Sequence, residues 1–151
     1  MIDRLATIAA GACAALLLAA APALAAQPCK TDDLTGVWSL KSIHAEQPGV
    51  QDFYSAHPVE YLRFRADGKY DYVAMNQPLT GLAAISASLD RADVADGVTL
   101  MGILMNEAGV LILMRDGEAF EGFMCAMDGP AMVWTEIEGN PPLRRVQVRV
   151  R

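Results

Sequence analysis

The sequence predicts a mainly β protein: an eight-stranded antiparallel up-and-down barrel with one short helix between the third and fourth strands. Three observations lead to this fold class. Apolar and polar residues alternate with a period of two in short segments, as in strands with one buried and one wet face. Turn chemistry, as at Asp67-Gly68 and Asp128-Gly129-Pro130, separates these segments. Most joining turns are short, and eight strands paired in chain order close into a barrel that holds side chains or one small ligand.

The first 26 residues predict a secretory signal peptide, which leaves residues 27–151 as one domain. Asp3 and Arg4 precede an apolar run that ends at the small-x-small site Ala23-Leu24-Ala25. A membrane anchor is the alternative, but the run is mostly alanine and no cluster of Lys or Arg follows it. We therefore expect an exported protein, periplasmic or secreted, without a membrane span after cleavage.

The strand pattern is clearest near the two ends of the domain. In the first strand Trp38 and Leu40 share one face, and in the last strand valines alternate with arginines and a glutamine. The segments 98–105 and 110–115 are instead apolar on both faces. The predicted strands are 36–43, 59–65, 69–75, 98–105, 110–115, 119–127, 131–137 and 143–151.

A short amphipathic helix is predicted at 79–92. Leu82, Ile85 and Leu89 recur there at spacings of three and four residues, with polar residues between them. The residues 84–89 also fit a strand, and this alternative stays open. The long first loop, 46–58, is rich in Gly, Pro and acidic residues and is expected to be irregular.

Two cysteines remain once the signal peptide, with Cys13, is removed. An even count in an exported chain predicts one disulfide between Cys29 and Cys125, and the alternative is a pair of free thiols. In the chain-entropy model the bond stabilises the fold by roughly 4 kcal/mol, because it closes the long loop 30–124.

Charge and motifs exclude several function classes. The formal net charge of -6 argues against nucleic acid and anionic membrane surfaces as partners. The sequence contains no phosphate loop, Gly-x-Ser-x-Gly elbow or Cys–His pair, so we expect neither an enzyme nor a cofactor. His44 and His57 match no metal-ligand spacing and are interpreted as loop residues, and the methionines are interpreted as core filler.

Two segments resemble the lipocalin-like (calycin) barrels of bacteria. Leu34-Thr35-Gly36-Val37-Trp38-Ser39-Leu40 is similar to their opening Gly-x-Trp strand, and residues 61–70 are similar to their second hairpin. The resemblance implies a barrel closed at one end around Trp38 and open to a hydrophobic ligand at the other. It also implies an arginine of the last strand over the tryptophan ring, for which Arg145, Arg149 and Arg151 are the candidates. The helix that follows the last strand in true lipocalins is missing here, and a mid-chain helix is predicted instead.

The alternation also gives a set of inward side chains that would line a ligand site. Aromatic and methionine side chains around a concave apolar space bind small lipophilic ligands, although a filled core uses the same residues. The predicted function is binding of a small hydrophobic ligand, such as a fatty acid or a similar lipid. The alternative is a filled barrel that acts through its surface as a protein-binding or inhibitor module of the cell envelope. The predicted ligand-binding residues are Trp38, Leu40, Phe64, Tyr70, Tyr72, Phe120, Met124 and Trp134.

The strands 98–105 and 110–114 need a cover on both faces, since exposed apolar patches usually mark a cap or a partner. The simplest cap is the amphipathic segment around Leu82, Ile85 and Leu89. If that segment lies elsewhere, we expect the protein to form a homodimer through this surface.

Overall fold

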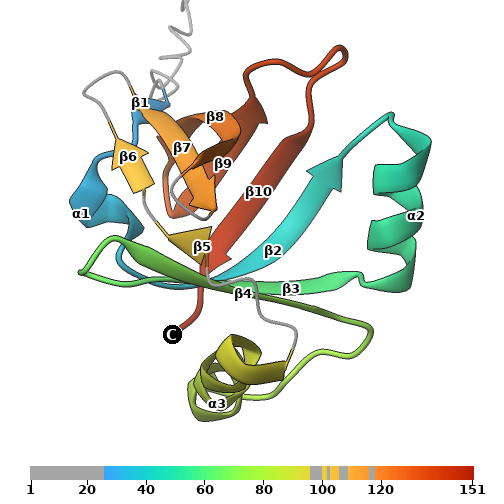
Figure 1. Cartoon of the computed structure of the whole chain (residues 1–151), viewed down its shortest axis with the longest axis vertical. Coiled ribbons are helices and arrows are strands. Elements are labelled where there is room, and N and C mark those ends of the chain that lie inside the picture. Colours follow the sequence, from blue (N-terminus) through green and yellow to red (C-terminus); the bar gives the residue numbers. More distant parts are fainter. Residues whose placement is uncertain (1–25, 96–99, 102, 106–108, 116–117) are drawn as a thin grey trace, which may run out of the picture.

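One antiparallel sheet makes up most of the domain (Figure 1). The computed structural model describes residues 26–95, 100–101, 103–105, 109–115 and 118–151, so the predicted signal peptide lies outside the described residues. Within them the sheet has ten strands in the order β5-β4-β3-β2-β10-β9-β8-β7-β6, and β1 pairs with β8. Among the same residues, no helix has both the length and the apolar character needed to cross a membrane. The strands are β1 (Gln27–Pro28), β2 (Gly36–His44), β3 (Val59–Phe64), β4 (Lys69–Met75), β5 (Leu100–Met101), β6 (Ile103–Met105), β7 (Val110–Arg115), β8 (Glu118–Asp128), β9 (Ala131–Glu136) and β10 (Arg144–Arg149).

The prediction of a mainly β, antiparallel fold is confirmed, but the prediction of a closed barrel is wrong. The sheet curls into a half-barrel whose two ends are β5 and β6. Within the segment 98–105, expected to be one strand, the described residues form β5, which pairs with β4, and β6, which pairs with β7. Among the described residues β5 forms a ladder only with β4 and β6 only with β7, so the described hydrogen bonding does not run around a full ring.

Three helices are described: α1 (Thr31–Leu34), α2 (Pro48–Ala56) and α3 (Leu82–Ala95). The predicted helix begins at Leu82 instead of residue 79, and in the described part of the chain it packs on β3 and β4 rather than on the strands of the segments 98–105 and 110–114. The other two helices were not predicted. α2 replaces an expected irregular loop, and its start follows from Pro48, whose fixed φ suits the first turn of a helix.

The curled sheet has a hydrophobic core on each face. The concave face holds the larger one, built around Trp38, Phe64, Phe123 and Trp134. On the convex face Ile85 and Leu89 of α3 pack on Val37 and Tyr61. α3 is therefore fastened to the outside of the sheet, where Figure 1 shows it below β3 and β4.

A buried carboxylate fixes the sheet beneath α3. Asp71 is 1% exposed and accepts hydrogen bonds from Arg63 Nε at 2.5 Å and from Arg65 Nε at 2.8 Å. Arg63 also donates to Asp90 of α3 at 2.7 Å. The two arginines thus hold β3 and the turn after it to β4, and Arg63 also joins them to the helix.

We expect Asp71→Asn to lower the free energy of unfolding by about 2–3 kcal/mol, because it removes the buried carboxylate that two partly buried guanidinium groups share. Urea denaturation measures the loss. Asp90→Asn is the matched control, since this partner is 66% exposed and such a pair contributes less than about 1 kcal/mol. Equal losses in the two variants would contradict the role assigned to Asp71.

At one end of the half-barrel buried side chains surround Trp38, and we call this the closed end. Trp38 Nε1 donates to Leu34 O at 2.7 Å, and the Arg149 guanidinium carbon lies 4.4 Å from the ring centroid. Arg149 also donates to Asp33 O at 2.6 Å and to Thr35 O. Of the three candidate arginines, Arg149 is therefore the one that covers Trp38.

Gly36 is needed for this arrangement. Its φ is +130°, which side-chain-bearing residues rarely adopt, and a Cβ there would lie 2.5 Å from Arg149 Nη1. The glycine of the Gly-x-Trp segment thus leaves room for the arginine.

We expect Arg149→Ala to lower the free energy of unfolding by about 1–2 kcal/mol, through loss of the cation–π contact and of two bonds to carbonyl groups. Tryptophan fluorescence during urea unfolding measures it. Arg149→Lys should recover only part of the loss, because an ammonium cannot donate to two carbonyls while lying flat on the ring. A lysine variant as stable as the parent would contradict this explanation.

The predicted disulfide is present between Cys29 and Cys125, whose Cα atoms are 5.4 Å apart. Both residues are buried in the concave core, and Cys29 N donates to Cys125 O at 3.0 Å. The bond holds the segment with β1 and α1 against β8.

Candidate functional site

Four of the predicted ligand-binding residues meet on the concave face. Trp38, Phe64, Tyr70 and Trp134 belong to one core cluster and are 0–2% exposed. Phe64 lies 5.8 Å from Tyr70 and 5.7 Å from Trp134, measured between ring centroids. Side chains buried to this degree contact protein on every side, so they form a packed core at the closed end.

Leu40 and Tyr72 lie on the same face but are only half-buried. Both point inward by register, because Leu40 pairs with Gln147 and Tyr72 pairs with Leu62. The concave face is therefore densely filled around Trp38 and more accessible toward these two residues.

The prediction that Met124 points inward is wrong. It lies on the convex face, 46% exposed, while Phe123 and Cys125 on either side of it are buried. The predicted disulfide could have shown this, because an inward Cys125 places Met124 on the opposite face by alternation. Phe120 lies in β8, and its side chain is outside the described residues.

Sequence reasoning missed a charged pair in the concave interior. Glu60 and Arg145 are 0% and 6% exposed, and the Arg145 guanidinium donates to Glu60 Oε1. Glu60 Oε2 accepts a hydrogen bond from Tyr54 OH of α2 at 3.1 Å. The alternation through Glu60, Leu62 and Phe64 was the available signal, since it places the carboxylate on the same face as two core residues.

Aromatic rings enclose the Arg145 guanidinium. Its central carbon lies 5.4 Å from the Trp134 ring centroid and 5.9 Å from that of Tyr54. Burial lowers the pKa of Arg145. The guanidinium nevertheless stays cationic, because the ordinary pKa of arginine is so high.

Two phenols extend this cluster. Tyr54 and Tyr72 share a side-chain hydrogen bond, and burial raises the pKa of both. The Glu121 carboxylate adds to the rise in both pKa values, while Arg145 opposes it at Tyr54. Both phenols are therefore protonated at neutral pH, and Tyr54 is a donor to Glu60.

Helix α2 covers the cluster without being firmly packed. None of its residues is fully buried, although Val50 contacts the concave core. Besides Tyr54, two glutamines hold it: Gln47 Nε2 donates to Pro141 O at 2.9 Å and Gln51 Nε2 donates to Ala45 O at 2.7 Å. Figure 1 shows α2 standing beside the sheet rather than on it. Moving α2 would therefore expose little buried surface.

Several buried polar groups beside the charged pair have no hydrogen-bond partner. They are Trp134 Nε1, Arg145 Nε and both amide atoms of Gln147. Trp134 and Arg145 are direct cross-strand neighbours, and Gln147 follows two residues later on the same face. Buried donors are normally satisfied, so the three donors, Trp134 Nε1, Arg145 Nε and Gln147 Nε2, can bind an acceptor oxygen, whereas Gln147 Oε1 can accept a hydrogen bond itself.

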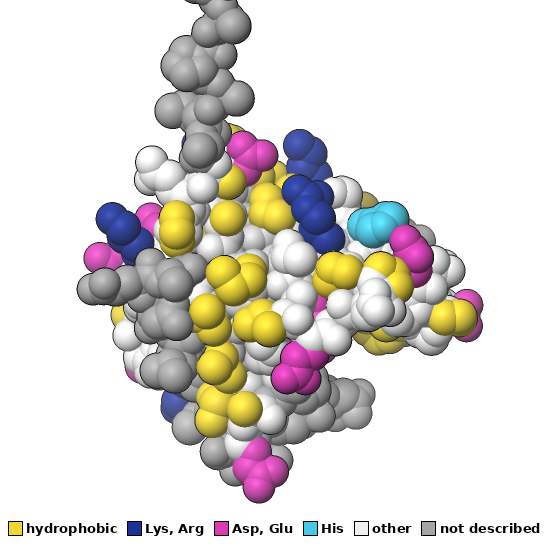
Figure 2. All heavy atoms as spheres, turned by 90° about the horizontal axis from the view of Figure 1, so that it is seen from above, with side chains coloured by type: hydrophobic (Ala, Val, Ile, Leu, Met, Phe, Trp, Pro, Cys, Tyr) yellow, Lys and Arg dark blue, Asp and Glu magenta, His cyan; other side chains and the backbone are white. Residues whose placement is uncertain are grey.

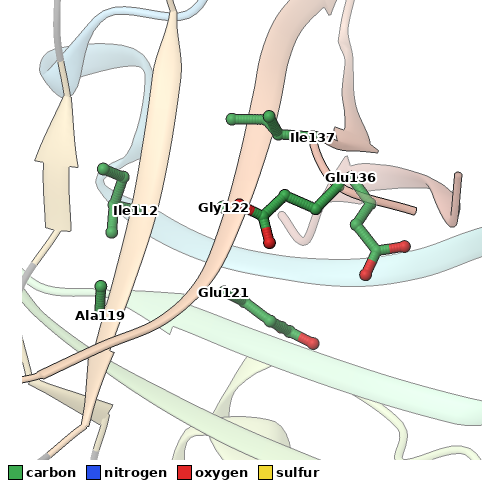
Figure 3. A pocket seen from close by; sticks show the side chains of 7 residues that line it. Ile112, Ala119, Glu121, Gly122, Glu136 and Ile137 are labelled. Carbon is green, nitrogen blue, oxygen red and sulfur yellow. The ribbon is translucent and has the colours of Figure 1, made fainter.

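A pocket of about 330 Å³ lies where β7, β8 and β9 run side by side (Figure 3). Gly122 lies between Ile112 and Ala119 on one side and Ile137 on the other. Three carboxylates also line it: Glu121, Glu136 and Glu138. Glu136 accepts a hydrogen bond from Leu143 N at 3.1 Å.

Glu121 lines this pocket and also lies near the interior cluster, because its negative charge helps to raise the pKa values of Tyr54 and Tyr72. The arrangement repels anions from this side of the cluster. In the described part of the chain, no three Asp, Glu, His or Cys residues are placed to hold a metal ion.

Comparison with known proteins gives no match: no family model, curated protein or solved structure is significantly similar to this chain.

Proposed function

We propose that this chain is an exported, lipocalin-like protein that binds a small uncharged hydrophobic ligand at the open end of its half-barrel, beneath α2. The buried Glu60–Arg145 pair, enclosed by Tyr54 and Trp134, carries the proposal. Buried ion pairs contribute little net stability compared with apolar residues of the same size. A charged pair in the interior of so small a domain is therefore better explained by recognition of a ligand than by stability.

The polar groups at the cluster indicate the head group of the ligand. Trp134 Nε1 and Arg145 Nε are donors without partners, so they suit an acceptor oxygen. Glu60 already neutralises the charge of Arg145, and Glu121 with Glu136 places further negative charge nearby. An alcohol, ester or amide oxygen fits this environment better than the carboxylate of a fatty acid.

The tail of the ligand would contact the half-buried Leu40 and Tyr72 once α2 moves aside. Burial of each methylene contributes about 0.8 kcal/mol, so a chain of moderate length supplies most of the affinity. The disulfide supports export to an oxidising compartment, periplasmic or extracellular, because such bonds persist there.

The test compares a monoacylglycerol with a fatty acid of the same chain length. The protein is exported to a bacterial periplasm, purified and titrated at pH 7.5, with tryptophan fluorescence and calorimetry as readouts. We expect the monoacylglycerol to bind at least about tenfold more tightly, and fatty acid binding to strengthen as its own carboxylate is protonated at lower pH.

Two variants locate the site. Tyr72→Phe removes one phenol from the cluster and should weaken binding about five- to tenfold, the usual effect of one lost hydrogen bond. Met124→Gln is the control, since Met124 is exposed on the convex face. Absence of binding by either lipid up to millimolar concentration would contradict the proposal, as would equal weakening by the two variants.

The alternative function, a filled half-barrel that acts through its surface, is favoured by the packed core at the closed end. Native mass spectrometry of the purified protein, followed by solvent extraction, separates the two. A released lipid supports the ligand-binding proposal, and a protein that carries nothing and binds neither lipid supports the alternative.

A further inference from the structure

The convex face of the sheet is covered on one half only. α3 covers Val37 and Tyr61 on the half that contains β2, β3 and β4. On the other half, formed by β7 to β10, no helix of the described residues packs across the strands. Figure 2, seen from above in the orientation of Figure 1 and so from the side away from α3, shows hydrophobic side chains gathered near the middle of that face.

The register identifies the residues of this convex patch. Buried Met132 and Trp134 point inward from β9, so the residues between and beside them point outward, and their cross-strand partners do the same. Apart from Arg144 and Asp128 at its corners, Thr135 is the one polar residue of this set among the described residues. The convex patch consists of Val110, Met124, Ala126, Ala131, Val133, Thr135, Val146 and Val148.

Opposite charges stand at diagonal corners of the convex patch. At one end of the ladder Arg144 pairs with Thr135, which pairs with Met124. At the other end Asp128 pairs with Ala131, which pairs with Val148. Val133 lies midway between these two rows, flanked by Ala126 and Val146. Both charged residues are exposed.

We propose that a second copy of this chain docks on the convex patch, related by a two-fold axis through Val133. The axis must lie in the plane of the interface, because the two sheets face each other, and it must run across the line from Arg144 to Asp128, so that these two diagonal corners are exchanged between the copies. It therefore places Arg144 of each copy opposite Asp128 of the partner subunit. Apolar sheet faces with β-branched residues pack on each other readily, and the two charge pairs set the orientation.

This interface revises the homodimer expected from the sequence. Of the segments 98–105 and 110–114, the first has side chains outside the described residues, and the second contributes Val110. The centre of the interface lies instead on β9. The proposal does not depend on the ligand, because the concave cluster lies on the opposite face.

Sedimentation equilibrium of the full chain, exported to a bacterial periplasm and purified, tests the proposal between about 1 µM and 1 mM. The convex patch is small compared with a standard interface, so we expect a reversible dimer with a Kd in the micromolar range. Val133→Lys should weaken it more than about a hundredfold by placing two like charges on the axis. Thr80→Lys adds the same charge at an exposed position before α3 and should change nothing.

A charge exchange tests the orientation with two exposed residues that lie outside both hydrophobic cores. Arg144→Asp and Asp128→Arg should each weaken the dimer about tenfold, since each places like charges opposite one another. The double variant should recover the parent Kd to within about threefold, because both pairs form again with reversed polarity. A monomer at every concentration overturns the proposal, and so does a double variant that stays as weak as the single ones.

Discussion

Replacing Arg145 with methionine should lower the free energy of unfolding by about 3–5 kcal/mol. Glu60 is fully buried, and in this variant its carboxylate would keep only the hydrogen bond from Tyr54. An uncompensated charge in the interior costs several kcal/mol, and the methionine restores little of the packing against Trp134. Urea denaturation at neutral pH, followed by far-UV circular dichroism, measures the loss.

The double variant Glu60→Leu with Arg145→Met is the control. It removes both charges, so we expect stability within about 1 kcal/mol of the parent or above it. The same variant should lose binding of the monoacylglycerol, since the proposed polar site is gone. A single Arg145→Met variant as stable as the double variant would show that the pair is solvated rather than buried.

Replacing both cysteines with serine should be the other large effect. The disulfide joins residues 96 positions apart, and in the chain-entropy model the loss of such a cross-link costs roughly 4 kcal/mol. For a domain of this size the midpoint of thermal unfolding should fall by about 15 °C. Differential scanning calorimetry of the parent and variant measures the shift.

Reduction of the parent protein gives an independent check. With dithiothreitol the parent should have the same midpoint of thermal unfolding as the variant without cysteines. The midpoint of the variant should not change when the reductant is added. A parent whose midpoint does not move on complete reduction would contradict the stabilising role, and it would mean that the unfolded chain is not expanded enough for the cross-link to matter.

The sequence pattern was informative where one face of a strand is buried and the other is wet. Segments such as 59–65 and 131–137 correspond closely to β3 and β9, because alternation and turn residues agree there. Barrel closure was not predictable in this way. It depends on whether the apolar segment 98–105 pairs on both edges, and a segment that is apolar on both faces carries no register information.

In the candidate site, too, some residues could be predicted from the sequence and others could not. The aromatic positions of the concave core follow from alternation through Trp38 and Phe64, together with the hairpin that brings Tyr70 opposite Phe64. Glu60 follows the same alternation, but glutamate is almost never fully buried unless it is paired. Only its partner Arg145, which is also buried, explains why the Glu60 side chain lies in the interior. The hydrogen bond from Tyr54 to Glu60 could not be predicted from the sequence, because it depends on helix α2, which forms within a segment expected to be a loop.

The sheet order has a consequence for how the chain acquires its structure. β2, near the start of the domain, pairs with β10, near its end, and Arg149 reaches Trp38 only through that pairing. Contacts between such distant parts of the chain form late and slowly, because the entropy of closing a long loop is lost before the contacts can stabilise the structure. The half-barrel therefore cannot be completed until the last strand is available. A chain threaded through a translocation channel from its N-terminus would stay unfolded, and so competent for transport, until nearly all of it has crossed.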